Sequence, residues 1–267
     1  MRASLPMYDL PELRAATDGW WAGLAAALVR QGFAPVPAGL DRSEPIARVW
    51  HAPDLLLSQC CSRDLVTHLA GVVAPVALPS YRVPGCGPGT YRSFLVVRRD
   101  DPRSDLAAFA GAVAAINYPG SHSGFVALAH TLARHGLPER FLGRGRLTGS
   151  HRASLVAVAG GRADLAAVDC VTWALLAAAD PALVGRLRIL AESEPAPALP
   201  YVTAIARPEE ERRRLFAALE ETALAPDLAA VRARLRIAGF LPATATAFAR
   251  TAAMAEAALK EPCAILG

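Results

Sequence analysis

The most constraining feature of this sequence is a strand-to-helix turn near the middle of the chain. The apolar run Ala112–Ile116 is typical of a buried strand, and apolar residues recur over 125–132 at the spacing of one helix face. Between them lies Asn117–Gly124, with the sequence Asn-Tyr-Pro-Gly-Ser-His-Ser-Gly, which we call the central turn. This arrangement places Ser121 or Ser123 as the N-cap of the helix.

The central turn combines groups that suit a bound anion. The first turn of a helix presents backbone N–H groups without acceptors, at the positive end of the helix dipole. Asn117, His122 and the two serine hydroxyls add further polar groups, and a second turn of the same kind follows at Gly149-Ser150-His151. The pattern therefore indicates an oxyanion site. A serine-capped turn with nothing bound is the structural alternative.

Composition limits the class of protein. The chain has 267 residues, of which 53% are hydrophobic and 19% charged, an ordinary globular balance for one large domain or two lobes. The formal net charge is +4, Lys260 is the only lysine, and the arginines are scattered along the chain. Because no basic cluster with interleaved aromatic residues occurs, we expect no nucleic-acid partner.

The ends and the cysteines suggest a compartment and a redox state. No apolar run reaches the ~18 residues that span a bilayer. The start of the chain, residues 1–9, predicts a short strand and not a signal peptide, so the expected compartment is cytoplasmic if the N-terminus is complete as written. The five cysteines form no CxxC pair, so we expect no metal site. Cys60 or Cys61 is compatible with a disulfide to Cys86, and free thiols are the alternative.

The order of predicted elements indicates an α/β fold. In the first part, strands over 3–7, 33–36, 54–57 and 72–78 alternate with helices over 9–31 and 63–69. Asp9 and Glu12 have the spacing of a capping box for the first helix. A second series places strands at 92–98, 112–116, 145–147, 164–168 and 187–191, each followed or preceded by a helix. After a strand at 201–206, the remainder is predicted to be helical. Such alternation favours mostly parallel sheets with helices on both faces.

Two passages rich in Pro or Gly, near 80–93 and 193–202, divide this pattern into two lobes. We expect lobe one to comprise residues 1–93 plus 193–267 and lobe two residues 94–192. The two passages would be crossover strands that act as a hinge. A ligand would then lie in the cleft between the lobes, at the carboxyl ends of the strands.

Polar residues follow several predicted strands and are the candidate ligand-binding residues. Each has a structural alternative: Tyr8 and Gln59 as surface residues, and His151 and Asp169 as helix caps. Their convergence at strand ends favours a shared crevice. The candidates are Tyr8, Ser58, Gln59, Asn117, Ser121, His122, Ser123, His151 and Asp169.

These residues resemble a known family. The order of Tyr8, Ser58-Gln59, Pro119-x-Ser-x-Ser-Gly124 and Gly149-Ser150-His151 is similar to that of phosphate, phosphite and phosphonate substrate-binding proteins of ABC transporters. The resemblance covers most of the chain, to about Gly239-Phe240. It implies a two-lobed periplasmic-binding-protein-like fold of type II, a small anionic ligand, no cofactor, an ABC permease as partner, a monomer and a periplasmic location.

The resemblance also implies roles for individual residues. Ser121, His122 and Ser123 would hold the oxyanion, and His151 would support them. Tyr8 and Gln59 would close from the other lobe. Asp169 would face the remaining end of the ligand.

The sequence departs from the family pattern at three places. Tyr118-Pro119 stands where the family has Asp-Pro, and His122 occupies the middle hydroxyl position. The return crossover reads Ala198-Leu199-Pro200, without the second acid of aminoalkylphosphonate binders. We therefore expect an anion or small polar solute other than aminoethylphosphonate.

An enzyme on the same fold is the alternative function. Soluble enzymes that make vitamin or quinone precursors share this architecture. His122, His151, Asp169, Cys60 and Cys61 are residue types able to perform acid–base or nucleophilic chemistry. No spacing enforces a catalytic triad and no dinucleotide loop occurs, so we expect a binding protein and name no catalytic residue.

Overall fold

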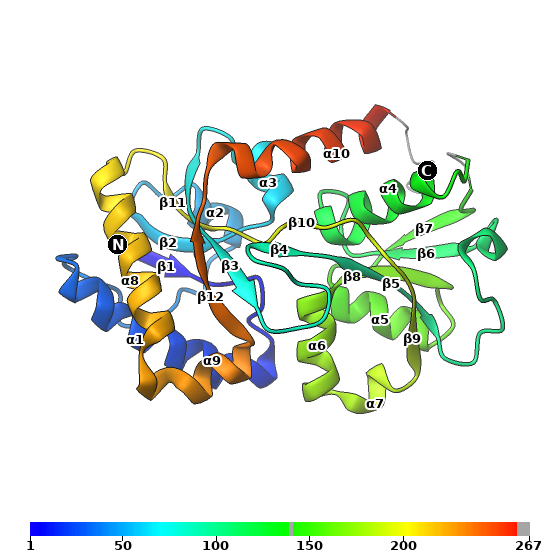
Figure 1. Ribbon diagram of the computed structural model, residues 1–267, viewed down its shortest axis with the longest axis horizontal. Coiled ribbons are helices and arrows are strands. Elements are labelled where there is room, and N and C mark those ends of the chain that lie inside the picture. The colour runs from blue at the N-terminus through cyan, green and yellow to red at the C-terminus, as the bar shows by residue number, and fades with distance from the viewer. Residues whose placement is uncertain (139–140, 261–267) are drawn as a thin grey trace. The chain divides into compact units, whose positions relative to one another are not determined.

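The computed structural model describes residues 1–138 and 141–260, and the chain forms two compact units (Figure 1). Unit 1 comprises Met1–Arg82, Gly87–Thr90 and Pro197–Phe248. Unit 2 comprises Val83–Cys86, Tyr91–Ala196 and the chain from Ala249 onward. Each unit has its own sheet and its own hydrophobic core.

Unit 1 is built on a five-stranded sheet of order β1-β2-β11-β3-β12. β1 and β2 pair in parallel, whereas β11 is antiparallel to both β2 and β3, and β12 is antiparallel to β3. Strands β1, β2 and β3 therefore share one direction, and the late strands β11 and β12 run against them. Their bounds are β1 Arg2–Ser4, β2 Leu55–Gln59, β3 Val73–Tyr81, β11 Tyr201–Ala204 and β12 Ile237–Pro242.

Helices cover both faces of this sheet, because alternate strand residues point to opposite faces. Leu55, Val73 and Val202 form one buried cluster with Val49 and Leu65 of α2 and α3. The opposite face is covered by α1, α8 and α9, where Trp20 and Leu215 are fully buried. The helices are α1 Arg14–Arg30, α2 Ile46–Trp50, α3 Ser62–Val66, α8 Glu209–Leu224 and α9 Ala229–Leu235, with 3₁₀ turns at Pro11–Leu13, Pro226–Leu228 and Ala245–Phe248.

Unit 2 is built on a second five-stranded sheet, of order β7-β6-β8-β5-β9. β6 pairs in parallel with β7 and β8, whereas β5 is antiparallel to β8 and β9. Four strands thus share one direction and β5 alone opposes them. The bounds are β5 Ser93–Arg98, β6 Val113–Ile116, β7 Arg144–Leu147, β8 Leu165–Asp169 and β9 Leu187–Glu192.

Figure 1 shows α4 on one face of the unit 2 sheet and α5 on the other. Leu95, Ile116 and Leu165 pack toward Leu128 of α4. A π-helical turn, His122–Val126, lies between β6 and α4. The other elements are the 3₁₀ turn Leu106–Phe109 and the helices α4 Ala127–Arg134, α5 His151–Ala159, α6 Cys170–Ala179, α7 Pro181–Val184 and α10 Ala249–Lys260.

Two of the passages of the chain between the units lie within short strands that pair with each other, and the chain also changes unit at 82/83, 86/87 and 248/249. The two short strands are β4 Thr90–Tyr91 and β10 Ala196–Pro197, which form a separate two-stranded sheet. In each strand, the first residue belongs to one unit and the second residue to the other. The strands that follow them, β5 and β11, are each antiparallel to both of their neighbours in the sheet.

Three local predictions were wrong. Asp9 does not cap α1, because its carboxylate pairs with Arg42 at 2.5 Å and the helix begins after a 3₁₀ turn without a side-chain cap. Residues 33–36 form a loop; Pro35 has no amide hydrogen for a strand ladder. The strand predicted over 54–57 does not end at residue 57 but continues through Ser58 and Gln59.

The region after β11 is not entirely helical. β12 lies at the edge of the unit 1 sheet and pairs with β3. The division into lobes also differs from the predicted one at the C-terminal helix. Met254 of α10 is buried in the core of unit 2, and Arg250 forms an ion pair with Glu194 of that unit at 2.8 Å.

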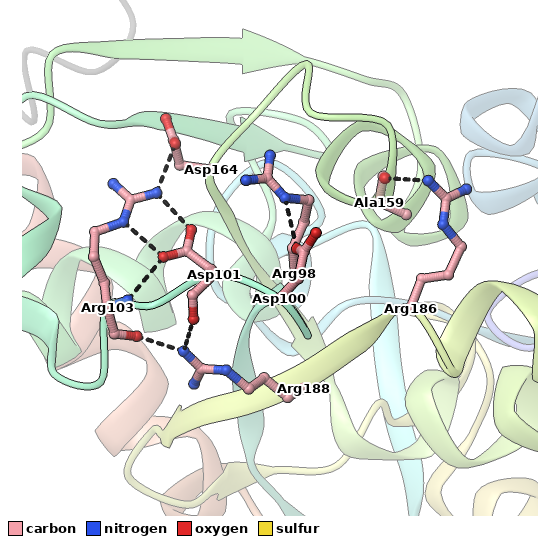
Figure 2. Close-up of polar contacts among 8 residues, drawn as sticks. All are labelled: Arg98, Asp100, Asp101, Arg103, Ala159, Asp164, Arg186 and Arg188. Carbon is pink, nitrogen blue, oxygen red and sulfur yellow. Dashed lines mark hydrogen bonds and ion pairs between the residues drawn. The ribbon is translucent and has the colours of Figure 1, made fainter.

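Unit 2 is stabilised by a network of charges around Asp101 (Figure 2). Asp101 accepts two hydrogen bonds from the Arg103 guanidinium, at 2.9 and 2.6 Å, and Arg103 also contacts Asp164 at 2.8 Å. Asp164 in turn accepts from the amide of Val113 at the start of β6. Arg188 of β9 donates to the carbonyl groups of Asp101 and Arg103. The network therefore fixes the 100–104 loop against two strands.

We expect Asp101→Asn to destabilise the protein at neutral pH. Arg103 lowers the pKa of Asp101 to about 2, from an ordinary value of 3.8. A lowered folded-state pKa contributes stability above the unfolded value, and that stability is lost as the pH falls from about 4 to about 2. Since Arg103 is 28% exposed and solvent screens the pair, we expect a loss of about 1–2 kcal/mol in unfolding free energy at pH 7.

Chemical denaturation of the two proteins at pH 7 and at pH 2 tests this prediction. Asp100→Asn is the matched control, because the Asp100 side chain is 83% exposed and forms a surface ion pair with Arg98. The control should change the unfolding free energy by less than about 0.5 kcal/mol. A difference between wild type and Asp101→Asn that persists unchanged at pH 2 would contradict the assignment.

Candidate functional site

The central turn folds as a π-helical turn at the start of α4. The amide of Val126 bonds the carbonyl of Ser121, five residues earlier, at 3.1 Å. Ser121 is the N-cap, and its hydroxyl accepts a hydrogen bond from the amide of Gly124 at 2.9 Å. The amides of Ser123 and Phe125 come before that of Val126, which makes the first five-residue hydrogen bond of the π-helical turn. π-Helical turns of this kind are frequent at functional sites.

The two turns singled out in the sequence meet in unit 2. Ser123 Oγ lies 2.8 Å from Nε2 of His151, the first residue of α5. The same nitrogen lies 3.4 Å from Oδ2 of Asp169 at the end of β8. When Nε2 carries a proton, it donates to Ser123 or Asp169, and the serine hydroxyl hydrogen is available to a ligand.

Burial governs the ionisation of His151. Removal from solvent lowers the pKa of the imidazole, while the charge of Asp169 acts in the opposite direction. The ring is therefore neutral at pH 7. A neutral imidazole adds no charge of its own to the site and acts as a hydrogen-bonding group.

The arrangement of Ser123, His151 and Asp169 is not that of a catalytic triad. In a triad, the acid holds one ring nitrogen of histidine while the other faces the serine. Here both Ser123 Oγ and Asp169 Oδ2 approach Nε2. Asp169 also caps α6, because its Oδ1 accepts from the amide of Thr172 at 2.8 Å. The predicted capping role of Asp169 is thus confirmed.

Asn117 is the first residue of the central turn and carries a buried side-chain acceptor. Its Oδ1 is buried and has no hydrogen-bond partner among the described residues. A Cβ built on Gly124 would lie 1.9 Å from this oxygen and 3.2 Å from Cε1 of His151. Only glycine therefore fits between Asn117 and His151. Amide oxygen and nitrogen are assigned by network alone, so the same position can present an N–H donor inward.

His122 points away from solvent and packs against an aromatic ring. Its side chain is 1% exposed, and its ring lies edge-on to Tyr91 with centroids 6.4 Å apart. Tyr91 was not among the predicted site residues. Tyr91 stands at the end of a passage rich in Gly and Pro, and this position is the feature of the sequence that could have indicated it as a site residue.

Of the three candidates in unit 1, Tyr8 and Gln59 line a small cavity, and Ser58 belongs to the core. Tyr8 packs edge-on to Tyr81 with centroids 5.4 Å apart, and Gln59 Nε2 donates to the Tyr81 hydroxyl at 3.2 Å. Tyr8, Gln59 and Tyr81 line a cavity of about 30 Å³, enough for one water molecule. Ser58 is fully buried, and its hydroxyl accepts from Nε1 of Trp50 at 3.2 Å.

The cysteines do not form the predicted pairing. Cys86 Sγ lies 3.4 Å from Cys170 Sγ, so its neighbour is neither Cys60 nor Cys61. No disulfide joins Cys60, Cys61, Cys86 or Cys170 to another described cysteine in this structure. Cys263 lies outside the described residues.

Within the described part of the chain, no His, Cys, Asp or Glu side chains gather in a group of three or more suited to a metal ion. Its helices are also all too short or too polar to cross a bilayer.

Comparison with known proteins decides between the alternatives. The family model for the periplasmic substrate-binding protein of phosphonate ABC transporters matches residues 67–248, more than half of the chain. The chain belongs to this family. As a member of this phosphonate-binding family, it is a solute-binding component of an ABC transporter, which implies a small ligand and a permease partner. Among curated proteins, no sequence matches the chain significantly.

Solved structures share the fold of this family member. PhnD1 from Prochlorococcus marinus in complex with methylphosphonate aligns with a TM-score of 0.76 at 14% identity, over 98% of each chain. A binding protein component of an ABC phosphonate transporter from Pseudomonas aeruginosa aligns with a TM-score of 0.76 at 15% identity, over 98% of this chain and 87% of that one. XAC2383 from Xanthomonas citri bound to chloride gives 0.72 at 16% identity, over 98% of each. The predicted two-lobed type II fold is confirmed.

Proposed function

We propose that this protein captures a small oxyanion of the phosphonate or phosphate class at the central turn and delivers it to its permease. The observation that carries the proposal is the meeting of the two turns at Ser123 and His151. Their 2.8 Å contact joins the start of the π-helical turn to a second helix start, in unit 2. Helix N-termini with free N–H groups favour negatively charged ligands.

Each residue of the site has a role in this proposal. The amides of Ser123 and Phe125 and the Ser123 hydroxyl donate to the oxyanion. His151 sets the direction of that hydroxyl through its Nε2, and Ser121 holds the turn by capping the Gly124 amide. Asn117 supplies a further polar group from the end of β6. Asp169 orients His151 and α6.

The roles of the remaining candidates rest on the resemblance to the family. Tyr8 and Gln59 would contribute polar groups from unit 1, beside the hollow that they line. We also propose that the protein acts as a monomer, as the resemblance implies. The ligand of PhnD1, methylphosphonate, is the first compound to test.

A thermal-shift panel tests the proposed ligand class. At a hundredfold excess over the dissociation constant, a bound ligand adds about 2.7 kcal/mol of stability. For a chain of this size we expect methylphosphonate or phosphate to raise the melting temperature by about 5–10 °C. Dimethyl methylphosphonate, which has the same phosphorus centre without a charge, is the matched control and should give no shift.

Either of two outcomes would contradict the proposal. One is equal shifts with the anion and its neutral ester, because the site would then recognise something other than charge. The other is no shift with phosphate, phosphite and a series of phosphonates. An enzyme would instead convert one of these compounds, and phosphorus NMR of the same mixtures detects turnover.

A further inference from the structure

Two cysteines that are distant in sequence meet beneath the candidate site. Cys86 and Cys170 are 84 positions apart, yet their sulfur atoms lie 3.4 Å from each other. A disulfide has an S–S length of about 2.05 Å, so bond formation requires an approach of about 1.4 Å. The other described cysteines, Cys60 and Cys61, are adjacent to each other in the sequence and belong to unit 1.

The position of Cys170 links this pair to the candidate site. Cys170 is the first residue of α6, it is fully buried, and its amide donates to the carbonyl of Arg92 at 2.9 Å. It directly follows Asp169, which contacts His151. Any bond that fixes Cys170 therefore also fixes the start of α6 beneath the Ser123–His151 contact.

The position of Cys86 links the pair to the passages of the chain between the units. Cys86 ends Val83–Cys86, a four-residue segment of unit 2 with unit 1 residues on both sides. The segment packs closely on α6, because a Cβ built on Gly85 would lie 3.1 Å from Cβ of Cys170. Gly85 has a φ of +89°, a conformation that favours glycine. The backbone is thus shaped to bring the two cysteines together.

We propose that Cys86 and Cys170 are a modification site and form a disulfide in the mature protein. The bond ties the 83–86 segment to the start of α6. The family is described as periplasmic, and that compartment is oxidising enough for disulfides to form and persist. This proposal is independent of which anion the protein binds.

The reaction is a thiol–disulfide exchange with an oxidant of the disulfide class, either a dithiol oxidase or oxidised glutathione. One cysteine thiolate attacks the oxidant and forms a mixed disulfide, releasing one thiol. The second cysteine then attacks its partner's sulfur, forms the Cys86–Cys170 bond and releases the second thiol. The two protein thiols lose two electrons and two protons, which reduce the oxidant to two thiols.

The folded protein slows this exchange. The contact with Cys170, together with burial, raises the pKa of the Cys86 thiol, so few thiolates are present once the pair is packed. We therefore expect the bond to form during folding, before Cys170 is buried. Refolding in a glutathione redox buffer is consequently the appropriate preparation for the test.

Peptide mapping of the full-length chain identifies the bond. The reduced, denatured protein is refolded with oxidised and reduced glutathione, alkylated in denaturant and digested with trypsin. We expect a linked pair of peptides, 83–92 and 163–186, about 2 Da lighter than the sum of the two thiol forms. Cys60 and Cys61 share the peptide 49–63, so a wrong pairing is recognisable. Alkylation of Cys86 and Cys170 as free thiols, or a link from either one to 49–63, would overturn the proposal.

Thermal unfolding with and without a reductant gives a second readout. A disulfide that closes a loop of this length should raise the melting temperature by about 5–10 °C, and reductant should remove that increment. Cys86→Ser should show the lower value in both conditions. Cys61→Ser is the control and should keep the sensitivity to reductant. A wild-type protein that is insensitive to reductant would contradict the proposal, even if the Cys86 variant fails to fold.

Discussion

Gly124→Ala should abolish oxyanion binding, with a loss of at least about 100-fold in affinity for methylphosphonate. The added Cβ would lie 1.9 Å from Oδ1 and 2.7 Å from Cγ of Asn117. It would also press on His151, 3.2 Å away at Cε1. Both neighbours belong to the proposed site, so relief of the overlap must move at least one of them. The loss of two hydrogen bonds to the anion, each contributing about 1.5 kcal/mol or more, corresponds to a loss of this size.

Calorimetric titration of the variant with methylphosphonate measures this effect. Overpacking of this kind also costs about 1–3 kcal/mol of stability, so circular dichroism must confirm that the variant is folded at the titration temperature. Gly39→Ala is the matched control, because a Cβ at Gly39 meets nothing within 4 Å. A folded Gly124→Ala protein that binds with wild-type affinity would place the ligand elsewhere.

The second large effect is expected for Ser123→Ala. This change removes one hydroxyl and leaves the backbone amides of the central turn in place. A hydrogen bond to a charged group contributes about 1.5–3 kcal/mol, so the affinity for methylphosphonate should fall by about 10- to 150-fold. The loss of the Ser123–His151 contact adds to this effect, because the imidazole then has no hydroxyl to direct.

Ser150→Ala separates a binding role from a capping role. Ser150 caps α5 through the amide of Ala153 at 3.1 Å and is exposed. Its removal should cost about 1 kcal/mol of stability and change the affinity by less than twofold. If Ser123→Ala binds as tightly as wild type, the Ser123 hydroxyl is not a ligand-binding group.

Periodic features of the sequence predicted the frame of the site well. The apolar run over 112–116 and the helical spacing over 125–132 fixed where β6 ends and where α4 follows. Serine as the N-cap was also predictable, since its hydroxyl acts on amides only three residues away. The π-helical form of the turn was not predictable. It depends on how His122 and Phe125 pack, which no local pattern encodes.

Interactions between distant residues account for most of the errors. The Asp9–Glu12 spacing predicted a capping box, yet Asp9 pairs with Arg42, which lies 33 positions away. The edge strand β12 was missed because Gly239 and Pro242 break its strand pattern, and its pairing with β3 spans the chain. In the site, the sequence placed Ser123, His151 and Asp169 at strand and helix ends. Only side-chain geometry could show that Ser123 and Asp169 both approach Nε2 of His151.

The most direct test of the central claim is an NMR titration of ¹⁵N-labelled protein with methylphosphonate. The account predicts the largest downfield proton shifts at the amides of Ser123 and Phe125, because these groups would donate to the oxyanion, whereas the Gly124 amide already donates to the Ser121 hydroxyl. The shifts should saturate together, at the dissociation constant found by calorimetry. Binding accompanied by large shifts elsewhere and none over 122–126 would contradict the account.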